Sequence, residues 1–359
     1  MKKKSIGKRI LAVIGILLAT VLTLVLLLLA FLSIAEFRPD SIETVNAEGT
    51  AEKTLSVGDT VTVMTWNIGY GALGEDADFF MDGGTMVRAE DRETVLKNMN
   101  GIEAEIQKIQ PDILLLQETD RCSSRSLKIN EYAMLEGDLS GYVSAFANNY
   151  KVAYIPYPMP PLGTVDSGIA TFSAFPMQNN ERVQLPVPFS WPVRTINLKR
   201  CLLISRIPID GSDRELVIVN LHLEAYDEGE GKLAQTKMLA DLLKEEAERG
   251  NYVIAGGDFN QVFSSVNTDA VPLYEGNWEA PEIDVRQFGE HFSFLMDETV
   301  PSCRLLDQPY RNADCSTFQY YIIDGFIVSD NLVIETVEAQ DIGFVYADHN
   351  PVVLKVTVR

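Results

Sequence analysis

The stretch "VIAGGDFNQVF", residues 253–263, ends an apolar run on an acid and an amide. Residues 253–255 have the composition of a buried strand, and two glycines then lead to Asp258 and Asn260. In α/β folds, the side chains that build a site stand where the sheet strands end at their carboxyl side. This stretch therefore predicts a strand that carries Asp258 and Asn260 into a functional site.

The same arrangement recurs along the chain. Residues 61–66, 112–117, 215–223, 321–329 and 351–358 each have the composition of a strand. Polar side chains stand at or beside the ends of these runs: Asn67, Glu118, Asn220, His222, Asp324, Asp348 and His349. We expect these side chains to meet at one edge of the fold.

Helices alternate with the strands. Apolar residues at helical spacing occupy one face of residues 95–109, and Pro111 ends that helix. A second helix is predicted with Leu233, Leu239 and Leu243 on one face. Further strands are predicted at residues 167–173 and 200–209. The alternation predicts an α/β fold in a single domain of stacked sheets and helices.

The polar residues at the strand ends are of the types that hold metal and phosphate. Glu118 and Asp348 offer carboxylate oxygens, which suit Mg²⁺ or Mn²⁺ better than Zn²⁺. The side chains of Asn67, His222 and Asn260 can hold phosphate oxygens without a fixed charge. These residues predict a site for a divalent cation and a phosphoryl group.

Three further residues supply acid–base chemistry. Asp258 can orient and deprotonate a water molecule. His349, paired with a carboxylate such as Asp324, can stabilise developing charge or protonate a leaving oxygen. Acids, amides and a metal that converge on phosphorus are typical of metal-assisted hydrolysis.

Each residue also has a plainer interpretation. His222 lies between two leucines and alone would be read as a core histidine, and Asp258 alone would be a turn residue after a glycine pair. Glu118 and His349 alone could belong to solvated loops. Their joint occurrence at strand ends favours the functional interpretation. His291 lies outside these motifs, and for it the plainer interpretation stands.

The motifs resemble those of a known family. In order, the chain carries "TWNIG", "QETD", "SGIATFS", "NLHLEA", "GGDFN", "IIDGFIV" and "DHNPV". This series is similar to the endonuclease/exonuclease/phosphatase superfamily over residues 61–359. The resemblance implies a four-layer α/β sandwich, in which two packed mixed β-sheets are flanked by helices. It also implies a hydrolase that acts on phosphate ester bonds.

The resemblance implies a role for each matched residue. Glu118 corresponds to the principal Mg²⁺ ligand, with Asn67 and Asp348 at the same metal end. Asp258 corresponds to the aspartate that activates water, and Asp324 to the acid that orients the catalytic His349. His222 corresponds to a phosphate-contacting catalytic position. Phosphate-binding roles are implied for Asn67, Asn220 and Asn260.

Some positions depart from the family pattern. Ala174 stands where many relatives have Arg or Lys, so Arg194 or Arg200 is the candidate for a phosphate contact. Ala347 stands where serine is usual. The segment "YYIIDGF" lacks the tryptophan and cysteine of the inositol-phosphate 5-phosphatases, which argues against that branch.

The N-terminal segment predicts a membrane anchor. Residues 1–9 are basic, and residues 10–34 form an uncharged stretch of 25 residues, long enough to cross a bilayer. A cleaved signal peptide, with "SIA" at residues 33–35 as the cleavage site, is the alternative. With the basic flank in the cytoplasm, the chain crosses the membrane once. A stalk at residues 35–59 then leads to a catalytic domain at residues 60–359, which lies outside the cytoplasm.

The net charge limits which partners the chain can bind. Five of the 30 basic residues precede residue 10, so the rest carries 25 basic and 51 acidic residues, a net charge of −26. This acidity weighs against tight nonspecific DNA binding.

The chain has four cysteines, and outside the cell an even count permits disulfides, for which Cys303 and Cys315 are the candidate pair. Cys201 is predicted to be a buried thiol.

Two stretches should select the substrate. Residues 76–91 follow the first strand, and residues 148–168 are rich in aromatics and prolines and should border the cleft. Their side chains would contact a base or a lipid, or would simply pack as rigid loops.

The sequence thus predicts a membrane-anchored, extracytoplasmic, Mg²⁺-dependent phosphoesterase that acts on a phosphodiester or phosphomonoester. A phospholipid headgroup, a nucleic acid and a small phosphodiester all remain open as substrates, and no protein partner is predicted. The alternatives are an extracellular nuclease specifically and a catalytically silent surface module that retains the fold. A zinc hydrolase is disfavoured by the scattered histidines.

Overall fold

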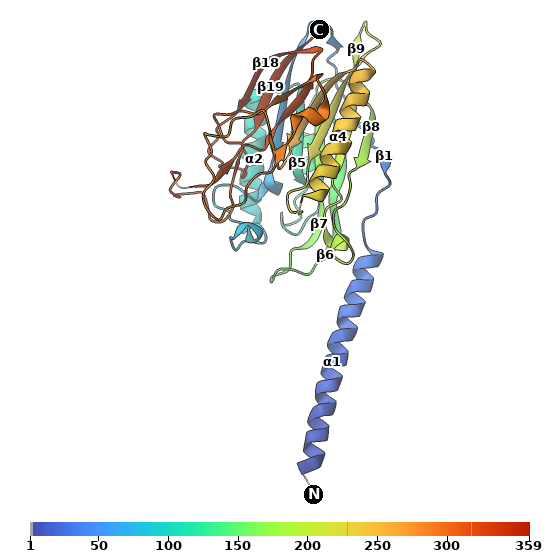
Figure 1. Ribbon diagram of the computed structural model, residues 1–359, viewed down its shortest axis with the longest axis vertical. Coiled ribbons are helices and arrows are strands. Elements are labelled where there is room, and N and C mark those ends of the chain that lie inside the picture. The colour runs from blue at the N-terminus through green and yellow to red at the C-terminus, as the bar shows by residue number, and fades with distance from the viewer. Residues whose placement is uncertain (1–2, 228, 317) are drawn as a thin grey trace.

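The computed structural model describes residues 3–227, 229–316 and 318–359. The helix α1, Lys3–Ile34, extends away from a body that holds the rest of the described chain (Figure 1). Within the body, two large sheets pack face to face with helices outside. This arrangement confirms the predicted α/β sandwich.

The first sheet contains the strands that begin and end the catalytic region. Its order is β18-β19-β4-β5-β7-β6-β2. The parallel neighbours β4, Thr60–Asn67, and β5, Ile113–Asp120, are joined by the helix α2, Arg92–Ile109. The remaining strands are β2 (Glu48–Gly49), β6 (Val143–Ile155), β7 (Gly163–Ser173), β18 (Leu332–Ala339) and β19 (Val352–Val358).

The second sheet repeats this arrangement. Its order is β1-β8-β9-β10-β11-β17-β14, with β3 beside β9. The parallel neighbours β10, Glu215–His222, and β11, Tyr252–Asp258, are joined by the helix α4, Glu230–Glu248. The remaining strands are β1 (Ile42–Thr44), β3 (Leu55–Ser56), β8 (Gln178–Gln184), β9 (Cys201–Asp210), β14 (Phe292–Leu295) and β17 (Asp324–Ser329).

Shorter elements connect the sheets. They are the helix α3 (Glu131–Asp138), the paired strands β12 (Val262–Phe263) and β13 (Glu282–Ile283), the paired strands β15 (Cys303–Arg304) and β16 (Tyr320–Tyr321), and the 3₁₀ turns η1 (Gly69–Gly71), η2 (Phe80–Asp82), η3 (Val193–Ile196) and η4 (Val285–Phe288).

Alternation along the strands divides the hydrophobic residues into layers. Val63 and Ile254 belong to the core between the sheets. Their neighbours Met64 and Val253 instead face the outer helices, where α2 covers one sheet and α4 the other. Both faces of each central strand are therefore buried, which is why these strands read as continuous apolar runs.

The glycine pair of "VIAGGDFN" allows β10 and β11 to approach closely. Gly257 has φ +155°, and a Cβ added there would lie 1.9 Å from the carbonyl oxygen of Leu221. A Cβ on Gly256 would lie 2.6 Å from the ring of Phe326. Side chains at these positions would push Asp258 away from the neighbouring strand.

Three expectations about the elements need correction. The segment at residues 35–59 is not a free stalk along its whole length, because β1, β2 and β3 within it pair with strands of the body. Residues 148–168 form most of a β6–β7 hairpin with a short tip rather than a loop. Leu233 is 60% exposed, although Leu239 and Leu243 are buried as predicted.

Candidate active site

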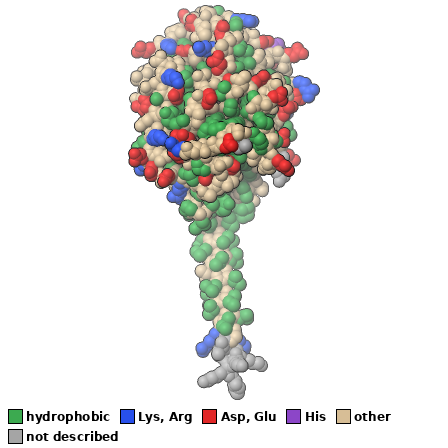
Figure 2. Space-filling model, turned by 90° about the vertical axis from the view of Figure 1, so that its left-hand side faces the viewer, with side chains coloured by type: hydrophobic (Ala, Val, Ile, Leu, Met, Phe, Trp, Pro, Cys, Tyr) green, Lys and Arg blue, Asp and Glu red, His purple; other side chains and the backbone are tan. Residues whose placement is uncertain are grey.

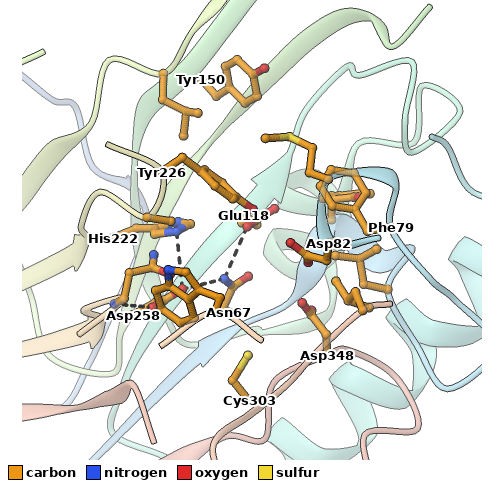
Figure 3. Close-up of a pocket in the computed structure, with 18 of the residues that line it drawn as sticks. Asn67, Phe79, Asp82, Glu118, Tyr150, His222, Tyr226, Asp258, Cys303 and Asp348 are labelled. Atoms are coloured by element: carbon orange, nitrogen blue, oxygen red, sulfur yellow. Dashed lines mark hydrogen bonds and ion pairs between the residues drawn. The ribbon is translucent and has the colours of Figure 1, made fainter. Parts of the chain in front are cut away.

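The polar strand ends meet at one end of the sandwich. The carboxyl ends of β4 and β5 in one sheet face those of β10 and β11 in the other, around a cavity of about 630 Å³. Asn67, Glu118, His222, Asp258 and Asp348 line this cavity and point toward one another (Figure 3). The structure thus brings together side chains that lie up to hundreds of residues apart in sequence.

Asn67 links the two sheets at the floor of the cavity. Its Nδ2 lies 3.1 Å from Asp258 Oδ2 and 3.4 Å from Glu118 Oε1. Its Oδ1 accepts a hydrogen bond of 3.1 Å from the backbone of Gly69, which fixes the orientation of the amide. One amide therefore contacts both the expected metal end and the expected water-activating acid.

His349 and Asp324 form a buried pair. His349 Nδ1 lies 2.8 Å from Asp324 Oδ2, and His349 Nε2 lies 3.9 Å from Asp258 Oδ2. Burial alone would lower the pKa of His349, but the adjacent charge of Asp324 raises that pKa well above its usual value. The imidazole is therefore protonated at neutral pH, and Nε2 presents a proton toward the cavity.

Asp258 has a perturbed carboxyl group. Burial and the nearby charge of Asp324 raise its pKa to about 7, although His349 acts in the opposite direction. Oδ1 accepts a hydrogen bond of 2.8 Å from the backbone of Asn260. A carboxyl group that titrates near neutral pH is suited to accept a proton from water.

His222 approaches the same carboxylate oxygen of Asp258 as His349 but differs from His349 in charge state. Its Nε2 lies 3.4 Å from Asp258 Oδ2, and burial together with the charge of Arg200 lowers its pKa well below the usual value. His222 is therefore neutral at neutral pH. A neutral imidazole at this place can contact a phosphate oxygen without adding fixed charge.

The expected metal end is formed by Glu118 and Asp348. Glu118 has φ 53° at an irregularity in the pairing of β5 with β7, which turns its side chain toward the cavity. Burial, with repulsion from Glu118, raises the pKa of Asp348 to about 6 even though His349 opposes the shift. Asp348 Oδ1 is buried and has no hydrogen-bond partner among the described residues.

These observations fit a divalent cation. A cation between Glu118 and Asp348 would satisfy the unpaired oxygen and relieve the repulsion of the two acids. Gly69 keeps the space beside that oxygen open, because a Cβ there would lie 2.7 Å from Asp348 Oδ1. Asn67 adjoins this end, since its Oδ1 accepts from the backbone of Gly69 and its Nδ2 lies 3.4 Å from Glu118 Oε1.

A second group of ligand atoms, on Asp258, Asp324 and His349, also lies within 4.8 Å of one another. We interpret this group as acid–base machinery rather than a metal centre. His349 Nδ1 is already bonded to Asp324, and the charged imidazole supplies the cation that the two acids need.

Two expectations about the site are wrong. Asn220 does not line the cavity, since its Nδ2 donates to the carbonyls of Ala170 and Leu116 and its Oδ1 accepts from Gln117, below the cavity floor. Cys303 and Cys315 are free thiols rather than a disulfide. Cys303 is buried beside His349 on β15, and Cys315 is exposed in a separate loop.

The structure also settles which arginine reaches the cavity. Arg200 lines it, whereas Arg194 is not among the lining residues and pairs with Glu36 at 3.1 Å. Arg200 is itself held by Glu224 at 3.4 Å. Ala174 is buried away from the cavity, so no side chain at that position contacts a substrate.

Asp82 is a lining residue that the strand-end argument missed. It projects from η2 toward Glu118 and Asp348 (Figure 3), and burial together with their charges raises its pKa to about 7. No apolar strand precedes Asp82, so the pattern that found the other acids could not mark it. Its position in residues 76–91, the stretch expected to select the substrate, was the available signal.

A buried acid–histidine pair beside a cluster of open carboxylates and amides can catalyse hydrolysis. The chain belongs to the Endonuclease/Exonuclease/phosphatase family, whose model matches residues 64–342. Members of this family hydrolyse phosphate ester bonds and generally use divalent metal ions, and this chain is a hydrolase of that class.

Solved structures share the fold. An endonuclease/exonuclease/phosphatase from Beutenbergia cavernae is 17% identical, covers 83% of this chain and 72% of its own, and has a TM-score of 0.54. The human Nocturnin catalytic domain with bound sulfate is 18% identical, covers 88% and 98%, and has a TM-score of 0.52. A protein from Bacteroides vulgatus is 14% identical, covers 84% and 100%, and has a TM-score of 0.53. No curated protein matches the sequence.

Proposed function

We propose that this chain is a Mg²⁺-dependent phosphoesterase, with Mn²⁺ as a second usable ion, anchored in a membrane with its catalytic domain outside the cytoplasm. The observation that carries the proposal is the position of Asn67 between Glu118 and Asp258. It joins the proposed metal end and the proposed water-activating acid in one hydrogen-bonded row.

The geometry supports hydrolysis by in-line attack of water. Asp258 orients the water and accepts its proton, while Asn67, Asn260 and His222 hold the phosphoryl oxygens. His349, oriented by Asp324, places the proton of Nε2 against the developing negative charge. A divalent cation held by Glu118 and Asp348 would supply Lewis-acid stabilisation of the phosphoryl oxygens.

The anchor proposal rests on α1. Its segment Gly7–Ile34 has 28 residues and contains an 18-residue window with a mean hydropathy of 3.0, none of which is buried against the body. Such a helix is long enough to cross a bilayer. Because the basic residues lie at the N-terminal end of the chain, before the uncharged residues 10–34, we place the N-terminus in the cytoplasm and the body outside.

A catalytically silent module is the competing function. It would keep the fold and lose part of the machinery, yet Glu118, Asp258 and His349 all line the cavity. A strictly nucleolytic function would call for free cationic side chains beside the cavity.

The test is turnover of bis(p-nitrophenyl) phosphate by the full chain in detergent, with Mg²⁺ or Mn²⁺ and with a chelator. We expect metal-dependent release of p-nitrophenol that Asp258→Asn reduces by about 10²-fold or more. Asp241→Asn, at an exposed position on α4, serves as the matched control. Metal-independent turnover, or turnover that Asp258→Asn leaves intact, would contradict the proposal.

A further inference from the structure

We propose that the substrate is a phosphate ester carried by a lipid of the same bilayer that α1 spans, and that an apolar rim beside the cavity contacts that bilayer. This inference rests on the proposed function and the proposed anchor. The rim consists of Met81, Tyr157, Met159, Trp191 and Val193.

The rim is a set of exposed apolar side chains beside the cavity. Its five side chains are between 50% and 85% exposed, with Met159 the most exposed. Met81, Tyr157 and Val193 also line the cavity, so the rim continues into the site. Figure 2 shows hydrophobic side chains gathered toward the centre of one face of the body and again where the body meets α1.

The end of α1 is fastened to the rim. Trp191 Nε1 donates a hydrogen bond of 3.0 Å to Ser33 Oγ in the last turn of α1. Glu36, just after the helix, pairs with Arg194 at 3.1 Å and with Lys199 at 3.5 Å. These contacts hold η3, which borders the cavity, against the point where the chain leaves the helix.

The length of α1 places this junction at the bilayer surface. A helix of 28 residues is about 42 Å long, which exceeds the hydrocarbon thickness of about 30 Å and matches the bilayer with its headgroups. Ile34, 86% exposed at the end of α1, then lies in the headgroup region beside Trp191. Tyrosine and tryptophan are the residues that favour this interface.

The body is oriented suitably for this contact. The β6–β7 tip, which carries Tyr157 and Met159, projects at the end of the body from which α1 emerges (Figure 1). The cavity lies at the carboxyl end of β4, toward the same end of the sandwich. A lipid headgroup therefore has a short path from the bilayer to Asp258.

The electrostatics of the cavity favour a single phosphate over a polyanion. Three arginines line it in the described part of the chain, and each is already engaged. Arg125 pairs with Glu118 and Asp120, Arg200 pairs with Glu224, and Arg304 donates to the carbonyls of Leu73, Gly74 and Ala77. A nucleic acid would need free cations for its flanking phosphates.

The walls instead suit the apolar part of a lipid. Phe79, Phe80, Leu162, Ile196 and Trp278 line the cavity together with the rim residues. The reaction requires water as its single co-reactant. The water oxygen bonds to phosphorus, the P–O ester bond breaks, and the leaving oxygen takes up a proton.

The experiment uses the full chain in proteoliposomes of phosphatidylcholine and phosphatidylglycerol, with Mg²⁺ or Mn²⁺. Lipid products are resolved by mass spectrometry, and bis(p-nitrophenyl) phosphate reports the soluble reaction. For the double variant Tyr157→Ser, Met159→Ser, we expect the ratio of lipid to soluble turnover to fall at least tenfold. Val57→Ser, 54% exposed at the opposite end of β4, is the matched control and should leave the ratio unchanged.

A second readout does not depend on catalysis. The readout uses Trp278→Phe as its background, because Trp278 is 36% exposed whereas Trp66 is fully buried. In that background, brominated phosphatidylcholine should quench part of the tryptophan fluorescence, and adding Trp191→Phe should remove that quenching. Absence of quenching in Trp278→Phe, or quenching that persists after Trp191→Phe is added, would overturn the rim contact.

The two proposals fail in different ways. Without soluble turnover that depends on Asp258, the proposed function fails, whatever the quenching shows. With such turnover present, the lipid inference is overturned if the vesicle lipids are not hydrolysed, if the ratio is the same in the rim variant, or if DNA or RNA is cleaved faster than lipid.

Discussion

At the scale of the residue, the two site histidines act through opposite charge states that their neighbours impose. Asp324 keeps His349 protonated, whereas burial and Arg200 keep His222 neutral. Asp258 Oδ2 lies 3.4 Å from Nε2 of His222 and 3.9 Å from Nε2 of His349. The same residue type therefore supplies both a neutral contact and a positive charge to one acid.

Replacing His349 tests the charged histidine. We expect His349→Ala to lower kcat by about 10²- to 10⁴-fold, the usual contribution of a positioned acid or base. The matched control is His291→Ala, because His291 pairs with Asp330 at 2.8 Å on the exposed surface. Steady-state kinetics with bis(p-nitrophenyl) phosphate measures both variants. An equal loss in the two, or a loss confined to KM in His349→Ala, would contradict the assignment.

Asp82 gives a test of the carboxylate cluster without metal. Its pKa is raised to about 7 in the folded chain, against about 4 in an unfolded chain. Ionisation therefore costs stability, beginning above about pH 4 and reaching its full extent above about pH 7. In the presence of chelator, Asp82→Asn should raise Tm more at pH 8 than at pH 5. A Tm difference that is the same at both pH values would show that Asp82 does not repel Glu118 and Asp348.

At the scale of the element, the position of a side chain along a strand decides its role. On β10, Ile218, Asn220 and His222 lie on one face, and each step of two residues is about 6.6 Å. Ile218 belongs to the core between the sheets, Asn220 bonds to Gln117 across them, and His222 alone reaches the cavity. The polar layer of Asn220 and Gln117 supports the floor of the site.

A substitution at Asn220 separates structure from phosphate binding. Asn220→Ala leaves the carbonyls of Leu116 and Ala170 without a buried donor, each unsatisfied group costing about 1–3 kcal/mol. We expect a lower free energy of unfolding in denaturant and an unchanged KM at a temperature where the variant is folded. Asn260→Ala, which alters a cavity residue, should instead impair turnover. A raised KM in Asn220→Ala would restore the phosphate role.

These elements show how far the sequence alone leads. Long apolar runs predicted the central strands, because strands buried on both faces are apolar along their length. The positions of Glu118, Asp258 and His349 at the ends of such runs marked them as candidate site residues. Strands of two or three residues, such as β1 and β3, carry no periodicity. Asn220 was assigned wrongly because a sequence indicates which face of a strand a side chain lies on, but not how far along the strand the packed core ends and the cavity begins. Asp82 depends on how η2 folds over the cavity, and local pattern does not encode that.

At the scale of the whole molecule, the charge distribution determines how the body can contact the membrane. Five basic residues lie within the first nine positions, and the rest of the chain carries a net charge of −26. A body so acidic meets the bilayer through the uncharged rim rather than through a basic patch, so the contact depends on the tether to α1.

The orientation of this assembly can be measured with cysteines that the chain already contains. Cys122 and Cys315 are exposed free thiols on the body, whereas Cys201 and Cys303 are buried. If the body lies outside the cytoplasm, a membrane-impermeant maleimide should label the protein on intact cells to the same extent as after lysis. The double variant Cys122→Ser, Cys315→Ser should remain unlabelled in both conditions and so controls for the buried thiols. Labelling that requires lysis would place the body in the cytoplasm. The lipid substrate would then have to come from the inner leaflet, because the hydrogen bond between Trp191 and Ser33 holds the rim beside whichever membrane surface the body faces.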